Sequence, residues 1–447
     1  MVSKGLTPPR VRPHGRALAG GLDPEPGARN SVQMETLVEK TGKTPAFTLD
    51  SRQAWVRLGV ALVIGSIGSV GMWSVVVVLP LVQAEFAASR GAASLAFTMA
   101  MLGFGLGGVA TGKLTDRFGI VIAIGSGIGL LGLGYVGAGL SVALWQFAAF
   151  HLLIGAGASA TFGPLMAEAS HWFERYRGLA VTIAASGNYL AGTIWPPLVN
   201  WGSASIGWRA THLAISGFCV VAMTLMVLIL RARMRGHAAA SHAAAPPPKI
   251  DLQLPTNTLT VLLSVASIAC CVAMAMPQVH IVAYCGDLGY GAARGAEMLS
   301  LMLAFGIISR IGSGFLADRI GGIRTLLLGS VAQGAALMFY LFFDSLGSLY
   351  VISAMFGLFQ GGIVPAYAII VREAMPAREA ATRVGIVIMA SVLGMSFGGW
   401  ISGVIFDATG SYAAAFVNGM AWNAVNVAII LMLLLRSRRR GPQVAMA

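Results

Sequence analysis

The chain has 447 residues, of which 56% are hydrophobic and only 11% are charged. A soluble globular domain carries about a quarter charged residues, so most of this surface must face something other than water. The four cysteines, in or beside apolar stretches, form no Cys-x-x-Cys pair, so neither a disulfide framework nor a zinc site is indicated. The composition predicts a protein that crosses a membrane several times.

The net charge of +13 is concentrated in segments that flank the apolar stretches, which argues against a nucleic-acid partner. The first 54 residues are rich in Pro, Gly and Arg and lack the apolar core of a signal peptide. We therefore expect residues 1–54 to be a disordered cytoplasmic tail, with Met34 as a second possible start.

Apolar stretches long enough for a membrane helix, roughly 20 residues for a bilayer core of about 30 Å, occur twelve times. They lie at 55–82, 93–114, 120–141, 143–169, 178–201 and 209–231, and again at 257–285, 293–317, 323–344, 346–371, 383–406 and 412–436. The polar segment 232–256 is expected to be a flexible linker. The sequence thus predicts an all-α polytopic protein with two six-helix bundles, 55–231 and 257–436, and a C-terminal tail, 437–447.

The distribution of Lys and Arg predicts the orientation, because cytoplasmic loops are enriched in these residues. With both termini inside, 26 of the 30 basic residues fall on the cytoplasmic side. Only Arg90, Arg209 and Arg294 fall on the outer side, and Arg310 lies within a span. We expect both termini to be cytoplasmic.

A repeat relates the two predicted bundles. Residues 112–119 read GKLTDRFG and residues 314–321 read GFLADRIG, each at the inner end of the second span of its bundle. A parallel duplication of six helices, with this motif in both copies, resembles the major facilitator superfamily of transporters. The resemblance implies a cytoplasmic gate, formed by Gly112, Asp116, Arg117, Gly314, Asp318 and Arg319. The alternative is that these residues only shape short turns.

A second resemblance narrows the branch. Residues 172–187 read WFERYRGLAVTIAASG, which is similar to the signature of the monocarboxylate transporter family at the same place. The text of the seventh predicted span, PQVHIVAYCGD at 277–287, resembles the bacterial branch of that family. The first-span signature is poorly kept, since the segment 69–74 lacks an acidic residue.

Arg310 lies deep within the predicted eighth span, where a charge is costly and usually serves function. Its planar guanidinium matches a carboxylate. The resemblance implies the same role, because monocarboxylate transporters carry an arginine at this place that is implicated in substrate binding. Animal members also carry an aspartate one turn earlier, where this chain has Gly306. The alternative is that Arg310 pairs with Glu168 or with backbone carbonyls.

The seventh predicted span contains His280, Tyr284 and Asp287, at helical spacing on one face. A histidine can exchange protons near neutral pH, and a nearby carboxylate can tune it. We therefore expect His280 and Asp287 to couple transport to protons, and His280 and Tyr284 to contact substrate. The alternative is that His280 bonds a backbone carbonyl and Asp287 is a residue of the membrane edge.

Further polar residues within the spans are candidates for substrate contact: Trp73, His151, Asn188, Tyr189, Gln360, Tyr367 and Ser396. The alternative is that they only join helices through hydrogen bonds. Glycines spaced four apart, at 108/112, 125/129, 394/398 and 399/403, predict close helix packing.

Together these features predict a secondary transporter of a small organic anion such as lactate or pyruvate, coupled to protons or acting by exchange. No nucleotide-binding loop, metal-ligand cluster or nucleophile elbow is present in the sequence, so we expect no enzymatic activity, metal or cofactor. We expect a monomeric unit in the lipid bilayer of the bacterial inner membrane. The alternatives are an exporter of drugs or metabolites with the same fold, and a membrane sensor of organic acids that does not transport.

Overall fold

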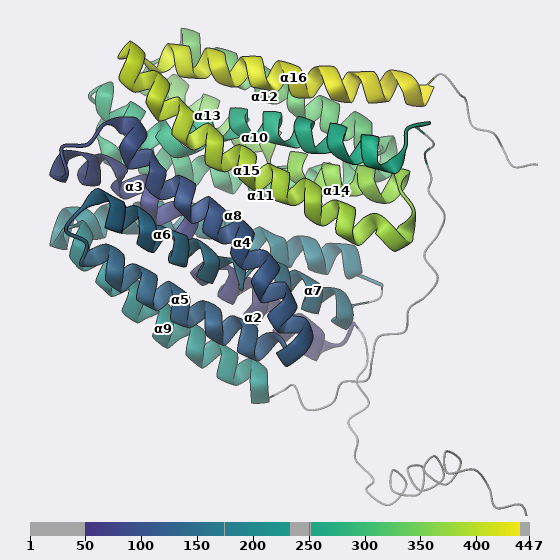
Figure 1. The fold of residues 1–447 in the computed structure, drawn as a ribbon, viewed down its shortest axis with the longest axis horizontal. Helices are drawn as coiled ribbons and strands as arrows, with labels where there is room; N and C mark the ends of the chain where they lie inside the picture. The colour runs from purple at the N-terminus through teal and green to yellow at the C-terminus, as the bar shows by residue number, and fades with distance from the viewer. Residues whose placement is uncertain (1–49, 174, 233–249, 251, 439–447) are drawn as a thin grey trace, which may run out of the picture. The chain divides into compact units, whose positions relative to one another are not determined.

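The computed structural model describes residues 50–173, 175–232, 250 and 252–438. Within these ranges every regular element is an α-helix, which confirms the predicted fold class (Figure 1). The predicted N-terminal tail as far as residue 49 and most of the predicted linker lie outside the described residues.

The first half of the described chain forms α2 (Arg52–Gly68), α3 (Val70–Glu85), α4 (Arg90–Phe118), α5 (Ile120–Gly139), α6 (Leu144–Ser159), α7 (Gly163–Trp172), α8 (Arg177–Ile206) and α9 (Trp208–Ala232). The second half forms α10 (Thr256–Asp287), α11 (Ala292–Ile320), α12 (Gly322–Phe342), α13 (Leu346–Gln360), α14 (Ile363–Ala374), α15 (Ala377–Thr409) and α16 (Tyr412–Arg438).

Three spans that the sequence predicts as continuous are each broken into two helices. The first breaks at Ser69, and the fourth breaks over residues 160–162. These two breaks contact each other, because a Cβ atom added to Gly68 would lie 2.4 Å from the side chain of Thr161. The tenth span breaks after Gln360, so the symmetry-related spans four and ten share this feature.

Eleven spans of the described chain, counting each broken pair once, have the length and apolar composition needed to cross a bilayer. The remaining long helix, α8, has 30 residues and carries two prolines and the polar pair Asn188 and Tyr189. It lies where the fifth span is predicted and packs against α2, α3 and α11. Large apolar side chains cover the outer faces of the helices; Leu133 and Leu106, for example, are 67% and 65% exposed, as a surface in lipid requires.

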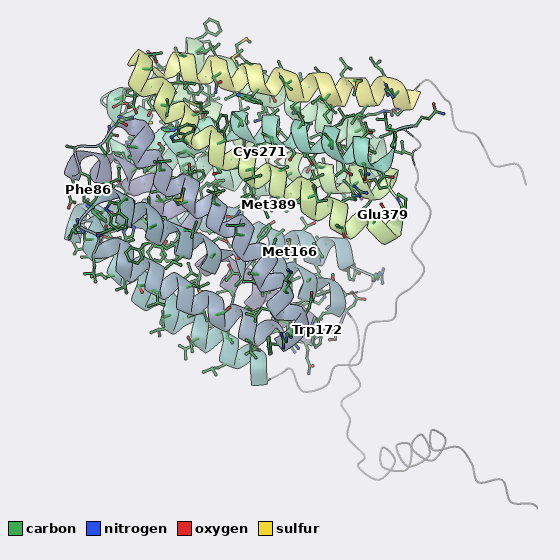
Figure 2. All side chains as sticks on the ribbon, viewed as in Figure 1. Phe86, Met166, Trp172, Cys271, Glu379 and Met389 are labelled. Carbon is green, nitrogen blue, oxygen red and sulfur yellow. The ribbon has the colours of Figure 1, made fainter. Side chains whose placement is uncertain are left out.

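Each half is held together by its own helix contacts. In the first half, α6 packs against both α4 and α5, and α5 packs against α9. In the second half, α10 packs against α15 and α16, and α11 packs against α13. The two halves meet along α4 and α15 (Figure 1), along α8 and α11, and through contacts between α3 and α10. Met389 of α15, labelled in Figure 2, packs against Gly105 of α4 at the first of these contacts.

The duplication extends to individual helix crossings. A Cβ atom on Gly155 would lie 1.8 Å from the carbonyl oxygen of Ala100, and one on Gly357 would lie 1.9 Å from that of Met302. The two crossings are separated by 202 positions, like the two motifs at 112–119 and 314–321. Glycine is therefore required at both sites so that neighbouring helix backbones can touch.

The glycine pairs predicted to pack closely divide into two groups. Close approach is confirmed for Gly394, Gly398, Gly399 and Gly403, where an added Cβ would lie between 2.6 and 2.9 Å from a neighbouring helix. The prediction is wrong for Gly108, Gly112, Gly125 and Gly129, which have no neighbouring atom within 4 Å of an added Cβ. Spacing alone does not say which face of a helix meets a neighbour.

The glycine crossings yield a stability prediction. Gly155→Ala and Gly357→Ala should each destabilise the protein by about 1–3 kcal/mol, because a backbone carbonyl cannot rotate away from the added methyl group. Gly108→Ala, with open space around it, should be neutral or stabilise the helix by up to about 1 kcal/mol. Thermal unfolding of purified variants in detergent measures the difference. Equal melting temperatures for all three variants would contradict the packing of these crossings.

Candidate functional site

Arg310 of α11 lies at the contact between the two halves and is only 8% exposed. Its Nη1 donates to the backbone carbonyl oxygen of Ala185 in α8 at 2.8 Å. Its Nε donates, over a longer 3.5 Å, to the carbonyl oxygen of Gly361 at the break between α13 and α14. The guanidinium group therefore bridges the two halves of the protein.

The partners of Arg310 in the described residues are neutral. No carboxylate among those residues lies within ion-pair distance of it. Of the two partners that the alternative interpretation names, Glu168 is wrong, because it pairs with Arg57 of α2 at 2.8 Å, whereas backbone carbonyls are the partners observed. A buried charge without a counter-ion is costly. An anion bound at Arg310 would supply the missing negative charge.

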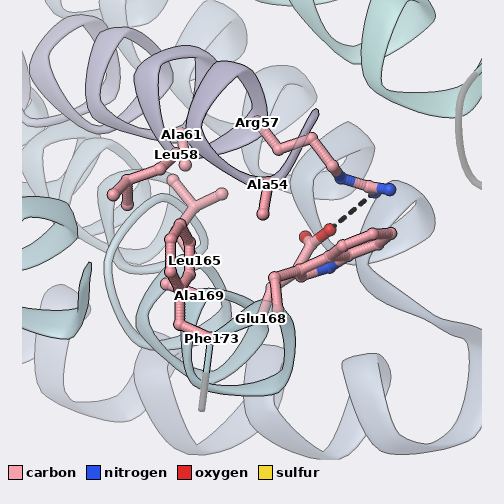
Figure 3. A pocket seen from close by; sticks show the side chains of 9 residues that line it. Ala54, Arg57, Leu58, Ala61, Leu165, Glu168, Ala169 and Phe173 are labelled. Carbon is pink, nitrogen blue, oxygen red and sulfur yellow. Dashed lines mark hydrogen bonds and ion pairs between the residues drawn. The ribbon is translucent and has the colours of Figure 1, made fainter. Parts of the chain in front are cut away.

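The Arg57–Glu168 pair lines a separate pocket within the first half (Figure 3). The ring of Trp172 covers the Arg57 guanidinium at 3.8 Å, and Phe173 lines the same pocket. The aromatic pair of the 172–187 signature thus packs against the start of α2. The pocket has a volume of about 10 Å³, room for about one water molecule, and is too small for an organic anion.

Tyr189 forms the aromatic face of the Arg310 site. The guanidinium carbon of Arg310 lies 4.4 Å from the centre of the Tyr189 ring, a cation–π contact. The edge of the same ring fills the space beside Gly306, where an added Cβ would lie 2.4 Å from it. The missing side chain of Gly306 therefore makes room for the tyrosine that covers the arginine.

Two more predicted residues lie beside Tyr189. The indole nitrogen of Trp73 in α3 donates to both the backbone oxygen and the side-chain oxygen of Asn188, each at 3.0 Å. One turn along α8, an added Cβ on Gly192 would meet both Trp73 and Leu303 of α11. Trp73, Asn188, Tyr189 and Arg310 are therefore gathered where α3, α8 and α11 converge.

The remaining predicted contacts are spread over the molecule. Gln360, the neighbour of Gly361 in the chain, accepts a hydrogen bond from Gln278 at 2.8 Å. Ser396 and Thr98 bond to each other's backbone oxygens across the contact between α15 and α4. Gln360 therefore lies close to the Arg310 site along the chain, and Ser396 lies at the contact between the halves.

Tyr367 and His151 lie within single halves. Tyr367 donates to Asn426 of α16 at 2.7 Å. His151 bonds the carbonyl oxygen of Phe147 at 2.8 Å and packs near His212. Neither side chain has a hydrogen bond or ring contact with Arg310. Their contact with substrate stays a prediction, and their observed contacts match the alternative of polar residues that join helices.

His280 and Asp287 belong to one cluster but do not touch each other. His280 Nε2 donates to the carbonyl oxygen of Gly399 at 2.8 Å, and its Nδ1 lies 3.3 Å from the hydroxyl of Tyr412. Asp287 forms an ion pair with Arg90 at 2.8 Å, and Arg90 also donates to the Tyr412 hydroxyl. The backbone bond of His280 is the one that the alternative interpretation expects. Tyr284 packs edge-on against the Tyr412 ring, at 5.4 Å.

Sequence reasoning missed three members of this cluster: Arg90, Asp407 and Tyr412. In the sequence, Arg90 was used only as one of the basic residues of the outer loops that indicate the orientation. Asp407 accepts hydrogen bonds from the backbone nitrogens of Arg90 and Gly91, at 2.8 and 2.7 Å. Because these residues come from α4, α15 and α16, no local motif contains them.

The predicted cytoplasmic gate is not closed in this structure. Asp116, Arg117, Asp318 and Arg319 are all exposed. No ion pair joins any of them to another part of the chain that the structure describes. Their role as a latch stays a prediction, and it applies to a conformation in which these helix ends approach each other.

The contact between Tyr189 and Gly306 yields a test. Gly306→Ala should push the tyrosine ring away from Arg310 and destabilise the protein by about 1–3 kcal/mol. In a Tyr189→Ala background the added methyl group meets open space, so the extra cost of Gly306→Ala should vanish. A double-mutant cycle of thermal stability measures this coupling. Additive effects would show that the two residues do not touch.

Comparison with known proteins agrees with this architecture. The family model described as Major Facilitator Superfamily matches residues 61–350 and 313–446. Monocarboxylate transporter 13 of Rattus norvegicus is 26% identical over 83% of this chain and 86% of its own length. Monocarboxylate transporter 13 of Bos taurus is 27% identical over 72% of this chain and 75% of its own length. The agnestins efflux protein AgnL12 of Paecilomyces divaricatus is 26% identical over 72% of this chain and 73% of its own length.

A solved structure shares the fold. The bacterial homolog of the human lysosomal transporter Spinster, in an inward-facing and unoccupied conformation, has a TM-score of 0.64 and 14% identity, covering 87% of this chain and 96% of that one. The duplicated motif, the two packed halves and the match of the family model over most of the chain lead to one conclusion: this multi-pass membrane protein belongs to the Major Facilitator Superfamily of transporters.

Proposed function

We propose that the protein is a secondary transporter of a small organic anion, most simply a monocarboxylate such as lactate or pyruvate, that works by alternating access. The observation that carries this proposal is the buried Arg310 guanidinium, whose partners in the described chain are all neutral. Two relatives named as monocarboxylate transporter 13 support the substrate class.

The contacts of Arg310 suggest how binding would drive the conformational change. Its Nη1 is bound to Ala185 of the other half, so a carboxylate that takes this donor removes a hydrogen bond between the halves. Substrate would thus weaken the contact between α8 and α11 while it neutralises the charge. The complex of the anion with Arg310 has no net charge, so the low-dielectric centre of the membrane penalises it less than it penalises the separate anion and guanidinium.

A single cationic contact favours one carboxylate over two. The stretch 384–406 of α15 contains no Lys or Arg, and a dicarboxylate would need a second positive partner. Tyr189 and Trp73 place aromatic surface beside Arg310, which suits a short apolar tail. Monocarboxylates of two to four carbons are therefore the substrates to test first.

We further propose that transport is coupled to protons or to exchange, with His280 and Asp287 as the coupling residues. The charge distribution of the loops supports a cytoplasmic location of both termini in a bacterial inner membrane. The proposed functional unit is a monomer, because the substrate site lies between the two halves of one chain. Nucleic acid is not among the proposed partners.

An exporter of larger metabolites is the second candidate. The relative named agnestins efflux protein AgnL12 matches most of the chain as closely as the monocarboxylate transporters do. In that case Arg310 would bind the carboxylate of a larger acid.

Arg310 yields the decisive binding test. A thermal-shift screen of small carboxylates on the purified protein should find ligands that raise the melting temperature. Arg310→Gln should weaken a hit by about 10- to 100-fold, the value of a charge-assisted hydrogen bond, and Arg310→Lys should weaken it less. Arg209→Gln, which removes an arginine far along the chain from this site, is the control. Undiminished binding by Arg310→Gln would reject the proposed site.

Transport by proteoliposomes distinguishes the candidate functions. Counterflow of a labelled hit from the screen shows transport, whereas a sensor would bind the same acid without flux. An exporter of larger metabolites would give shifts only with larger acids, and its deletion would sensitise cells to them.

His280 provides the test of proton coupling. Uptake by the unmodified protein should rise as the external pH is lowered from about 8 to about 5, because transport is proposed to need a proton on His280. His280→Ala should transport with a pH profile that is flat over this range. A variant that kept the normal pH dependence would remove His280 from coupling, whatever its rate.

A further inference from the structure

Arg90 ties the two halves together at the end of the bundle where α4 begins. Its guanidinium donates to both oxygens of Asp287, at 2.8 and 3.2 Å, and to the hydroxyl of Tyr412. It also lies 4.4 Å above the ring of Phe406. Asp407 holds the backbone of the same residue through the first amide groups of α4. These five residues, Arg90, Asp287, Phe406, Asp407 and Tyr412, form what we call the Arg90 lock.

The duplication shows that this lock is a departure from symmetry. The 202-residue offset relates Glu85 of the first half to Asp287 of the second. Glu85 pairs with Arg209 of its own half at 2.6 Å. The position equivalent to Arg209 in the second half is Ser411, so Asp287 has no such partner there. It pairs with Arg90 of the first half instead, and the ion pair crosses between the halves.

Close packing surrounds the lock. A Cβ atom on Gly91 would lie 2.8 Å from Val404, and one on Gly403 would lie 3.0 Å from the carbonyl group of Arg90. At the opposite end, Asp116 and Asp318 are exposed and form no polar contact between the halves of the described chain. The halves are therefore closed at the Arg90 end. Alternating access requires this end to open once in each cycle.

The hydrogen bonds that leave the lock have a fixed direction. Arginine can only donate, so the Tyr412 oxygen accepts from Arg90. A backbone carbonyl can only accept, so His280 donates to Gly399 through Nε2. The Nδ1 of neutral His280 is then an acceptor, and Tyr412 must donate to it. A chain of hydrogen bonds thus runs from Arg90 through Tyr412 to His280.

We propose that the Arg90 lock is the gate at this end of the transporter and that a proton taken up by His280 releases it. This proposal rests on the proposed transport function and extends its proton coupling. The proton would add to Nδ1, which would then donate to the Tyr412 oxygen, and the hydroxyl hydrogen of Tyr412 would turn away. One phenol oxygen would then accept from two cations, His280 and Arg90, whose repulsion weakens the lock.

The other charged and titratable groups that face His280 belong to the same cluster. Asp407 approaches from α15, Arg90 from α4 and Tyr412 from α16, while Asp287 and Tyr284 follow it on α10. The two carboxylates hold Arg90 in both protonation states of His280. The proton therefore weakens the lock without neutralising either carboxylate, and it shifts the balance from the closed toward the open conformation.

Spin labels across the gate test the lock directly. Cysteines introduced at the exposed Ala84 and Ala408 place one label on each half at the Arg90 end, and the four native cysteines are buried. Pulsed electron paramagnetic resonance on the full chain in nanodiscs should show mainly a short distance at about pH 8. Arg90→Gln should shift the population to a longer distance. Glu85→Gln, which breaks the equivalent pair within one half, should leave the distance unchanged.

The proton dependence is tested with the same labels. Lowering the pH to about 5 should shift the unmodified protein toward the longer distance. Tyr412→Phe keeps the aromatic ring but removes the link to His280, and should give a distribution that no longer responds to pH. His280→Gln should behave in the same way and serves if Tyr412→Phe does not fold. A pH response of the unmodified protein that persists in these variants, or no response at all, would overturn the proposal.

The distance measurement needs no substrate, so it separates two kinds of failure. If no carboxylate binds but the distances respond as expected, the substrate assignment fails and the lock stands. If carboxylates bind and are transported but Arg90→Gln leaves the distance distribution unchanged, the gating role of the lock is rejected and the proposed function stands.

Discussion

A buried guanidinium at the contact between two half-bundles constrains the rest of the structure. Arg310 is bound to a carbonyl of each half and is covered by Tyr189, yet no carboxylate of the described chain neutralises it. A buried charge of this kind needs either an anion that binds reversibly or stabilisation by its hydrogen bonds to neutral groups alone. Because one of those bonds crosses between the halves, we propose that an anion bound at Arg310 changes the conformation of the protein.

The two halves share a frame and differ in their charges. Equivalent glycines, Gly155 and Gly357, let equivalent helices cross at backbone distance in both halves. The charged residues break this symmetry: the position of Arg310 is Gly108 in the first half, and the position of Arg90 is Ala292 in the second. The duplicated packing explains the fold, and the charges that occur in only one half are where substrate binding and gating are proposed.

Periodicity and composition sufficed to predict the helical fold, since a bilayer restricts the chain to helices of known length. Arg310 could be found because a charge within an apolar stretch is conspicuous. The packing of Tyr189 over Arg310 could not be found from the sequence, because that contact depends on the absence of a side chain at Gly306 in another helix. The Arg90 lock was missed for a similar reason, because its residues come from four helices. In addition, an arginine at a helix end cannot be told apart in sequence from the basic loop residues that indicate orientation.

The most direct test is a structure of the protein in nanodiscs with a carboxylate that the thermal-shift screen identifies. The expected result is a carboxylate oxygen within hydrogen-bond distance of Arg310 Nη1, with the Ala185 carbonyl released and the contact between α8 and α11 rearranged. A ligand bound elsewhere while Arg310 keeps its bond to Ala185 would contradict the assignment of this arginine to substrate.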